Sequence, residues 1–167
     1  MNRTSGIELD DLPGFQRKEW AAQRLGWTLM LLVVLAGAAG AFGRGPLASA
    51  SAATADGRLQ IRYERMTRHR VPTSLWLDVA PGVARGGRVR LEIDREYLQE
   101  VELTRVVPEP ESVEATGDGI VLAFRVGDPL RRAAIMLDVQ PESYGTLQGR
   151  LGLAGDAPLR FEQFVFP

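Results

Sequence analysis

Few residues in this 167-residue chain are suited to acid–base or nucleophilic chemistry. His69 is the only histidine, and it lies between Arg68 and Arg70, whose positive charges disfavour protonation of its ring. The chain has no cysteine, which excludes disulfides, thiolate metal sites and thiol nucleophiles. Nothing near His69 predicts a Ser-His-Asp arrangement or the several ligands of a zinc site. We therefore predict no catalytic residue, no metal site and no cofactor, and we place His69 in an exposed loop or at a strand end.

Carboxylates are plentiful, and three of them, Glu92, Asp94 and Glu96, alternate along a predicted strand. Alternation would project all three from one face, where their oxygens could bind Ca²⁺ weakly. The stretch lacks the loop geometry and the glycine of a dedicated calcium site. We favour a solvated sheet face with Arg90 and Arg95 nearby.

The chain is organised around Leu25–Gly43, nineteen residues without a charge that are bounded by Arg24 and Arg44. As a helix this run would be roughly 28 Å long, which matches a hydrocarbon core of about 30 Å. A buried helix of a soluble domain would carry charged residues on one face, and this run carries none. We predict an interfacial and transmembrane helix at 15–43, preceded by a disordered tail at 1–14.

The predicted membrane anchors are Trp20, Arg24, Trp27 and Arg44. The two tryptophans are seven residues apart, on nearly the same helical face, and tryptophan favours the headgroup region. Packing of Trp20 against a partner helix is the alternative.

Basic residues near the span predict its orientation. Arg17, Lys18 and Arg24 precede it, and Arg44 alone follows it closely. The positive-inside rule then places the N-terminus in the cytoplasm and the C-terminal domain outside. The abundance of alanine and glycine, with Lys18 as the only lysine, indicates a GC-rich bacterial genome, so the predicted location is the bacterial inner membrane.

Small residues dominate the second half of the span, and those predicted to pack are Ala36, Gly37, Gly40 and Gly43. Small residues four apart allow a second helix to approach closely. This favours self-association or a different membrane protein as partner, although such residues are also common in ordinary bacterial spans.

The segment 44–57 is small, mostly uncharged and aperiodic, which predicts a flexible tether. It contains the overlapping triplets Ala48-Ser49-Ala50 and Ala50-Ser51-Ala52, which are typical of signal peptidase sites. Cleavage near Ala50–Ala52 would release the downstream domain. The long apolar run and the long N-terminal region favour a retained anchor instead.

From Leu59 onward the hydrophobic period is two, which predicts strands with one buried face. The predicted runs are centred on 59–63, 75–79, 89–93, 101–107, 120–126, 135–139, 147–153 and 159–166. Glycine-rich turns such as Thr116-Gly117-Asp118-Gly119 separate them. Seven to nine short strands predict an all-β domain at 58–167, an immunoglobulin-like antiparallel β-sandwich preceded by one N-terminal transmembrane helix. A small closed barrel is the alternative.

Charge is distributed unevenly although the formal net charge is only -1. The stretch after the tether is rich in arginine, and the residues that we predict to interact are Arg62, Arg65, Arg68 and Arg70. They suit anionic headgroups or an acidic partner surface. A polar strand face is the plainer interpretation. Nucleic acid is not expected as a partner, because this part should lie outside the cytoplasm.

The C-terminal run Leu159–Pro167 carries aromatic residues at both parities of a strand. Either both faces are covered, or Phe164 and Phe166 leave one face open for a partner.

The Glu19-Trp20, Gln23-Arg24 and Gly26-Trp27 pairs before an apolar run resemble those of an uncharacterised family of small bacterial single-pass membrane proteins with an extracytoplasmic immunoglobulin-like domain. The stretch Pro108–Val113 and the phenylalanine-rich ending Phe161–Pro167 share this resemblance. It covers most of the chain and implies no activity.

These patterns together favour a non-enzymatic, membrane-anchored accessory subunit of another envelope protein. The expected partners are membrane lipid and a membrane protein or a second copy. The alternative is a module that binds a cation, a lipid headgroup or a glycan, either tethered or released.

Overall fold

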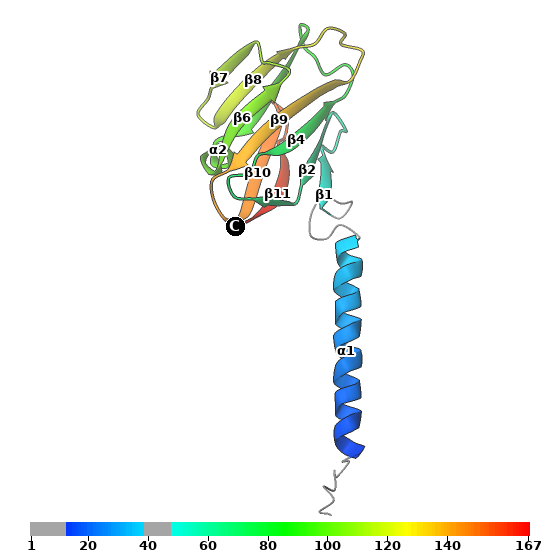
Figure 1. Ribbon diagram of the computed structural model, residues 1–167. Helices are drawn as coiled ribbons and strands as arrows, with labels where there is room; N and C mark the ends of the chain where they lie inside the picture. Colours follow the sequence, from blue (N-terminus) through cyan, green and yellow to red (C-terminus); the bar gives the residue numbers. More distant parts are fainter. Residues whose placement is uncertain (1–12, 39–47) are drawn as a thin grey trace, which may run out of the picture.

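The computed structural model describes residues 13–38 and 48–167. Within these ranges the chain forms one long helix, one short helix and eleven strands (Figure 1). In chain order they are α1 (Pro13–Ala38), β1 (Ser49–Ala53), β2 (Leu59–Glu64), β3 (Met66–Arg68), β4 (Thr73–Val79), β5 (Arg88–Asp94), α2 (Arg95–Glu100), β6 (Val101–Val107), β7 (Ser112–Ala115), β8 (Gly119–Arg125), β9 (Ala133–Pro141), β10 (Gly145–Leu153) and β11 (Leu159–Phe166).

Helix α1 is long and apolar enough over Trp20–Ala38 to span a membrane. Its nineteen residues rise roughly 28 Å, close to the thickness of a hydrocarbon core. Pro13 suits the first helical position because an N–H there would have no partner within the helix. The large apolar side chains of this segment are exposed in the isolated chain, so the helix has no protein core of its own.

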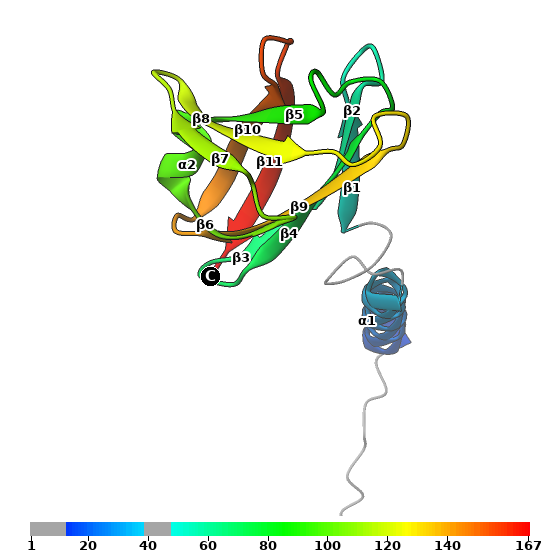
Figure 2. The ribbon, with the colours of Figure 1, turned by 90° about the horizontal axis from the view of Figure 1, so that it is seen from above.

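The strands form two sheets that pack face to face (Figure 2). One sheet has the order β1-β2-β4-β9-β6, and the other has the order β3-β11-β10-β5-β8-β7. All pairs are antiparallel except β3 with β11, which is parallel. The predicted all-β, immunoglobulin-like sandwich behind an N-terminal apolar helix is confirmed.

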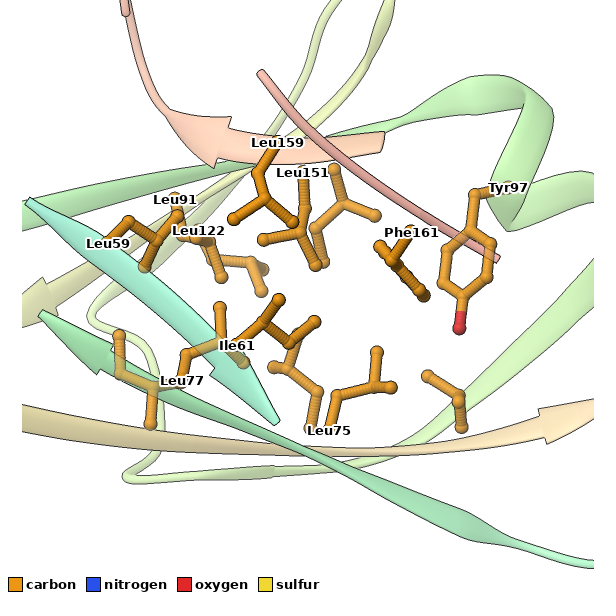
Figure 3. Packing of buried hydrophobic residues seen from close by; sticks show 14 of the residues in the cluster. Leu59, Ile61, Leu75, Leu77, Leu91, Tyr97, Leu122, Leu151, Leu159 and Phe161 are labelled. Carbon is orange, nitrogen blue, oxygen red and sulfur yellow. The ribbon is translucent and has the colours of Figure 1, made fainter. Parts of the chain in front are cut away.

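The core lies between the sheets and follows the predicted alternation (Figure 3). On β4, Leu75, Leu77 and Val79 are buried, whereas Trp76 points outward and is 48% exposed. The facing sheet contributes the inward residues of β5, β8, β10 and β11, among them Leu91, Leu122, Leu151, Leu159 and Phe161. Burial of this apolar surface is the main favourable contribution to folding.

Strand β1 corrects the prediction of a flexible tether over 44–57. Residues 44–47 lie outside the described residues, but Ser49–Ala53 pairs along its whole length with β2. Ala50 is buried and Ala52 half-buried, so the strand has an inward face made of methyl groups. Serine and alanine are weak strand formers. The strand therefore depends on hydrogen bonds with β2 rather than on a hydrophobic pattern that the sequence would show.

The antiparallel strands define two ends of the sandwich. The first end, which we call proximal, contains Ala48, where the described part of the sandwich begins. It also contains β3, the turn 141–145 and the end of β11 at Phe166. At the distal end are the turns 54–58, 80–87 and 153–158, which Figure 2 shows on the side away from the C-terminus.

An aromatic contact closes the core between β10, β11 and α2. Gly149 on β10 lies opposite Phe161 on β11, and the Phe161 ring covers the position that a side chain at Gly149 would occupy. Tyr97 of α2 meets the same ring edge to face, with centroids 5.2 Å apart. Tyr63 of β2 meets it from the other sheet, also at 5.2 Å. A side chain at position 149 would therefore overlap the Phe161 ring.

We expect Gly149→Ala to destabilise the fold by about 1–3 kcal/mol, because the added methyl group overlaps the Phe161 ring and the packed core must shift. Chemical denaturation of the full chain in detergent measures this change. Gly127→Ala is the matched control, since nothing lies within 4 Å of its added methyl group. Equal stability of the two variants would show that Phe161 moves aside at no cost.

Candidate functional site

His69 lies in the turn after β3, near the strand end where it was predicted. It is half-buried rather than exposed, and its ring stacks on Tyr144 with centroids 4.1 Å apart. Its backbone N–H donates to the carbonyl of Phe166 at 2.9 Å. His69 thus contacts Tyr144 through its ring and the end of β11 through its backbone.

The carboxylate row predicted for Glu92, Asp94 and Glu96 does not form. Glu92 and Asp94 are on β5, but the strand ends there and Glu96 belongs to α2. Asp94 caps that helix by accepting the Glu96 backbone N–H at 3.2 Å. Arg150 pairs with Asp94 at 3.2 Å and with Glu96 at 2.7 Å. Within residues 13–38 and 48–167 no group of three or more histidine or acidic side chains could hold a metal ion.

The predicted anchors on α1 are exposed where the structure describes them. Trp20 is 63% and Trp27 65% exposed, and the Arg24 guanidinium lies 4.9 Å from the centroid of the Trp20 ring. Of the predicted packing residues, Gly37 is exposed and Ala36 is half-buried. Gly40, Gly43 and Arg44 lie outside the described residues.

The four predicted arginines do not form one cluster. Arg62 lies on the outer face of the five-stranded sheet and pairs with Asp78 at 3.4 Å. Arg65, Arg68 and Arg70 are at the proximal end, where Arg70 pairs with Glu142 at 3.5 Å. Arg65 and Arg68 are exposed and make no ion pair within the described residues.

Successive side chains of β11 alternate strictly between a buried and an exposed face. Phe161 and Val165 are buried, whereas Phe164 is 50% and Phe166 42% exposed. In the parallel pairing with β3, Phe164 lies opposite Met66, which is 54% exposed, and Phe166 lies opposite Arg68. Phe164 and Phe166 are thus exposed, so the interpretation in which both faces of the strand are covered is wrong, and their contact with a partner stays a prediction.

These residues form what we call the proximal surface, which consists of Arg65, Met66, Arg68, Phe164 and Phe166. Exposed Val71 and Tyr144 lie in the neighbouring turns of the same end. Apolar and aromatic groups beside unpaired guanidinium groups are the composition found at binding hot spots. The proximal surface therefore combines apolar, aromatic and positively charged side chains on adjacent strands.

Backbone hydrogen bonds connect the proximal surface to Ala48, the first described residue after the helix. The Arg65 N–H donates to the Ala48 carbonyl at 2.7 Å, and the Arg65 carbonyl accepts from the Phe164 N–H at 2.7 Å. Ala48 follows Ala38, the last helical residue described, by ten positions, so a chain of that length spans at most roughly 35 Å. Ala48, to which the proximal surface is hydrogen-bonded, therefore lies within roughly that distance of Ala38.

A buried polar network supports this surface from below and was not predicted. Gln163 is 1% exposed at an inward position of β11, where its Oε1 accepts from the Tyr97 hydroxyl at 3.2 Å. Its Nε2 donates to the Glu64 carbonyl at 2.9 Å, which links β11 to the end of β2. Burial raises the pKa of the Tyr97 hydroxyl, so it remains a hydrogen-bond donor. A glutamine at an inward strand position was the only signal in the sequence.

Trp76 was also not singled out as an interaction residue. It lies in one row with Arg62, Met136 and Val107 on the outer face of the five-stranded sheet. Trp76 is 48% and Val107 42% exposed. A tryptophan at the polar parity of a strand was the available signal.

Comparison with known proteins gives no family. No family model matches the sequence, and no curated protein matches it. Among solved structures, the chain is similar to a cohesin module from the family 33 glycoside hydrolase of Clostridium perfringens ATCC13124, with a TM-score of 0.41 and 12% sequence identity. The match covers 65% of this chain and 95% of the module. The candidate site therefore rests on its own geometry.

Glu142 gives the proximal end a pH dependence. A hydrogen bond from Gln140, at 2.8 Å, and then the charge of Arg70 lower the pKa of the Glu142 carboxyl below its ordinary value of 4.5. A carboxylate with a depressed pKa stabilises the fold above its unfolded-state pKa, and this contribution is lost as pH falls through the folded-state pKa.

We expect Glu142→Gln to be less stable than the wild type near neutral pH, with a difference that shrinks on acidification below about pH 4.5. Unfolding of both proteins by urea at several pH values tests this. A stability difference that stays constant down to pH 3 would show that the fold does not favour the ionised carboxylate.

Proposed function

We propose that this protein is a non-enzymatic, single-pass protein of the bacterial inner membrane, whose extracytoplasmic β-sandwich serves as an accessory subunit of another envelope protein. The observation that carries the proposal is the proximal surface. It combines exposed aromatic side chains with unpaired arginines at the end of the sandwich where the chain arrives from an apolar helix. A partner that contacts this surface must itself lie close to the membrane.

The state of the anchor bears on this proposal, since a released domain would have no fixed position. The triplets Ala48-Ser49-Ala50 and Ala50-Ser51-Ala52, which are typical of signal peptidase sites, overlap β1. Cleavage after Ala50 or Ala52 would remove part of an edge strand that pairs with β2 over its full length. The pairing favours a protein that keeps its helix.

Lipid headgroups are the second class of partner with chemistry to suit this surface. Arginine near a membrane is attracted to anionic lipid by about 1 kcal/mol per residue, and phenylalanine suits the interface. We favour a protein partner because the exposed phenylalanines form a row with Met66 on adjacent strands, which presents a firm surface to a complementary pocket.

The proposed orientation is tested by cysteine labelling, which the cysteine-free chain makes specific. Leu130, in the turn after β8, is 79% exposed. We expect a membrane-impermeant thiol reagent to label Leu130→Cys in cells with a permeable outer envelope, and to label Ser5→Cys only after the inner membrane is lysed. The opposite pattern would place the sandwich in the cytoplasm.

The accessory role is tested by purification in mild detergent from native membranes. The tag belongs at the N-terminus, so that it does not cover Phe164 and Phe166 of the proximal surface. We expect full-length protein together with a stoichiometric membrane protein. Phe164→Ser combined with Phe166→Ser should lower recovery of that partner more than tenfold, since hot-spot residues contribute at least about 2 kcal/mol each.

Trp76→Ser is the matched control, an equally exposed aromatic residue on the opposite sheet. Loss of the partner with Trp76→Ser, but not with the phenylalanine variants, would place the interface on the five-stranded sheet and contradict the proposed surface. A full-length protein recovered alone or only with copies of itself would contradict the accessory role. A tagged fragment ending near Ala50 or Ala52 would contradict the retained anchor.

A further inference from the structure

Arginines gather at the distal end of the sandwich in an arrangement that is unfavourable on its own. Arg85 and Arg88 flank the tight turn at Gly86-Gly87 and exchange backbone hydrogen bonds of 2.9 and 3.1 Å, so they lie directly opposite each other. Arg88 is also opposite Arg125 on the next strand. Like charges directly opposite one another across strands destabilise a sheet.

Carboxylates compensate these charges only in part. Glu111 pairs with Arg88 at 2.7 Å and also with Arg125. On the same face Arg90 pairs with Glu114 at 2.9 Å. Arg85 has no ion pair within the described residues.

Arg85, Arg88 and Arg90 border a cavity of about 270 Å³. Its charged lining consists of Arg58, Arg85, Arg88, Arg90 and Asp156. Its apolar lining consists of Val83, Leu153 and Ala154. Asp156, the one carboxylate in the lining, pairs with Arg58 at 2.6 Å. The lining thus has four guanidinium groups and one carboxylate.

We propose that this distal cavity binds a multivalent oxyanion, namely a phosphate or sulfate group. Guanidinium groups bind such oxyanions through two parallel N–H···O bonds. Arg88 uses Nε for its hydrogen bond to Glu111, and Arg90 uses one Nη for Glu114, so each keeps further donors for a ligand. Arg85 contributes an entire guanidinium group.

Size and position restrict the ligand further. The cavity, at about 270 Å³, is slightly smaller than the range of about 300–1,000 Å³ that is usual for drug-sized molecules, which favours a small anion over a large organic ligand. The site lies at the opposite end of the strands from the proximal surface, so it does not depend on the accessory role proposed above.

The test is calorimetric titration of the full chain in uncharged detergent with pyrophosphate, inorganic phosphate and sulfate, each compared with sodium chloride at equal ionic strength. We expect saturable binding that is tightest for pyrophosphate. Arg85→Gln should weaken this binding roughly tenfold, as expected for the loss of one charge-assisted contact. Arg85→Lys should weaken it less, because it retains the charge but not the fork.

Arg105→Gln is the matched control, since Arg105 is an exposed arginine on β6 without an ion pair in the described part of the chain. Its binding should equal that of the wild type. No saturable heat beyond the chloride control would overturn the proposal, and so would unchanged binding by Arg85→Gln.

A second arm distinguishes a soluble oxyanion from a lipid headgroup. The same titration is made in nanodiscs of phosphatidylcholine alone and of phosphatidylcholine with phosphatidylglycerol. Equal pyrophosphate affinity in both discs would support the site with a soluble ligand. If the headgroup occupies the site, it competes with pyrophosphate. The pyrophosphate affinity of the wild type would then be lower in the phosphatidylglycerol discs, and that of Arg85→Gln would not.

Discussion

Strand β11 contributes one face to the buried core and the other to the exposed proximal surface, so the rest of the sandwich depends on its register. Its inward positions carry Phe161 over Gly149 and Gln163 in the buried network with Tyr97. Its outward positions carry Phe164 and Phe166 into solvent. Because side chains alternate with a period of two, a slip of one residue would expose the core and bury the candidate interface. The fold and the proximal surface are therefore specified by the same register.

Most of the fold was predictable because its strands bury one face and therefore show a period of two. The eight predicted runs correspond to β2, β4, β5, β6, β8, β9, β10 and β11. Strands β1, β3 and β7 were not predicted. Ser49–Ala53 has only methyl groups to bury, Met66–Arg68 is three residues long, and every residue of Ser112–Ala115 is exposed. Each is an edge strand held by its neighbour's hydrogen bonds, which leave no pattern in the strand's own sequence.

The candidate site was less predictable because pairing between distant segments decides which residues meet. Phe164 and Phe166 could be proposed from the parity of one strand, but their neighbours Met66 and Arg68 come from a strand about a hundred positions earlier. Arg62 was grouped with Arg68 by sequence, although they lie on different sheets. Glu96 left its predicted row because Asp94 caps a helix there. The distal arginines come from two stretches, Arg58 and the run that contains Arg85, Arg88 and Arg90, and only the fold brings Arg58 to that run.

The two candidate surfaces lie at opposite ends of the same strands, and this separation has a mechanical consequence. Strands β10 and β11 contain nine and eight residues, which gives a length of roughly 25–30 Å. Strand β10 joins Gly145 near the proximal surface to Leu153 in the lining of the distal cavity. A close-packed sandwich transmits displacement with little compression. On the function proposed above, a partner bound at the proximal surface would hold the distal cavity about one strand length away from that contact. The pairing of β1 with β2 makes Ser49–Ala53 part of the packed sandwich, so this segment contributes to the stability of the domain.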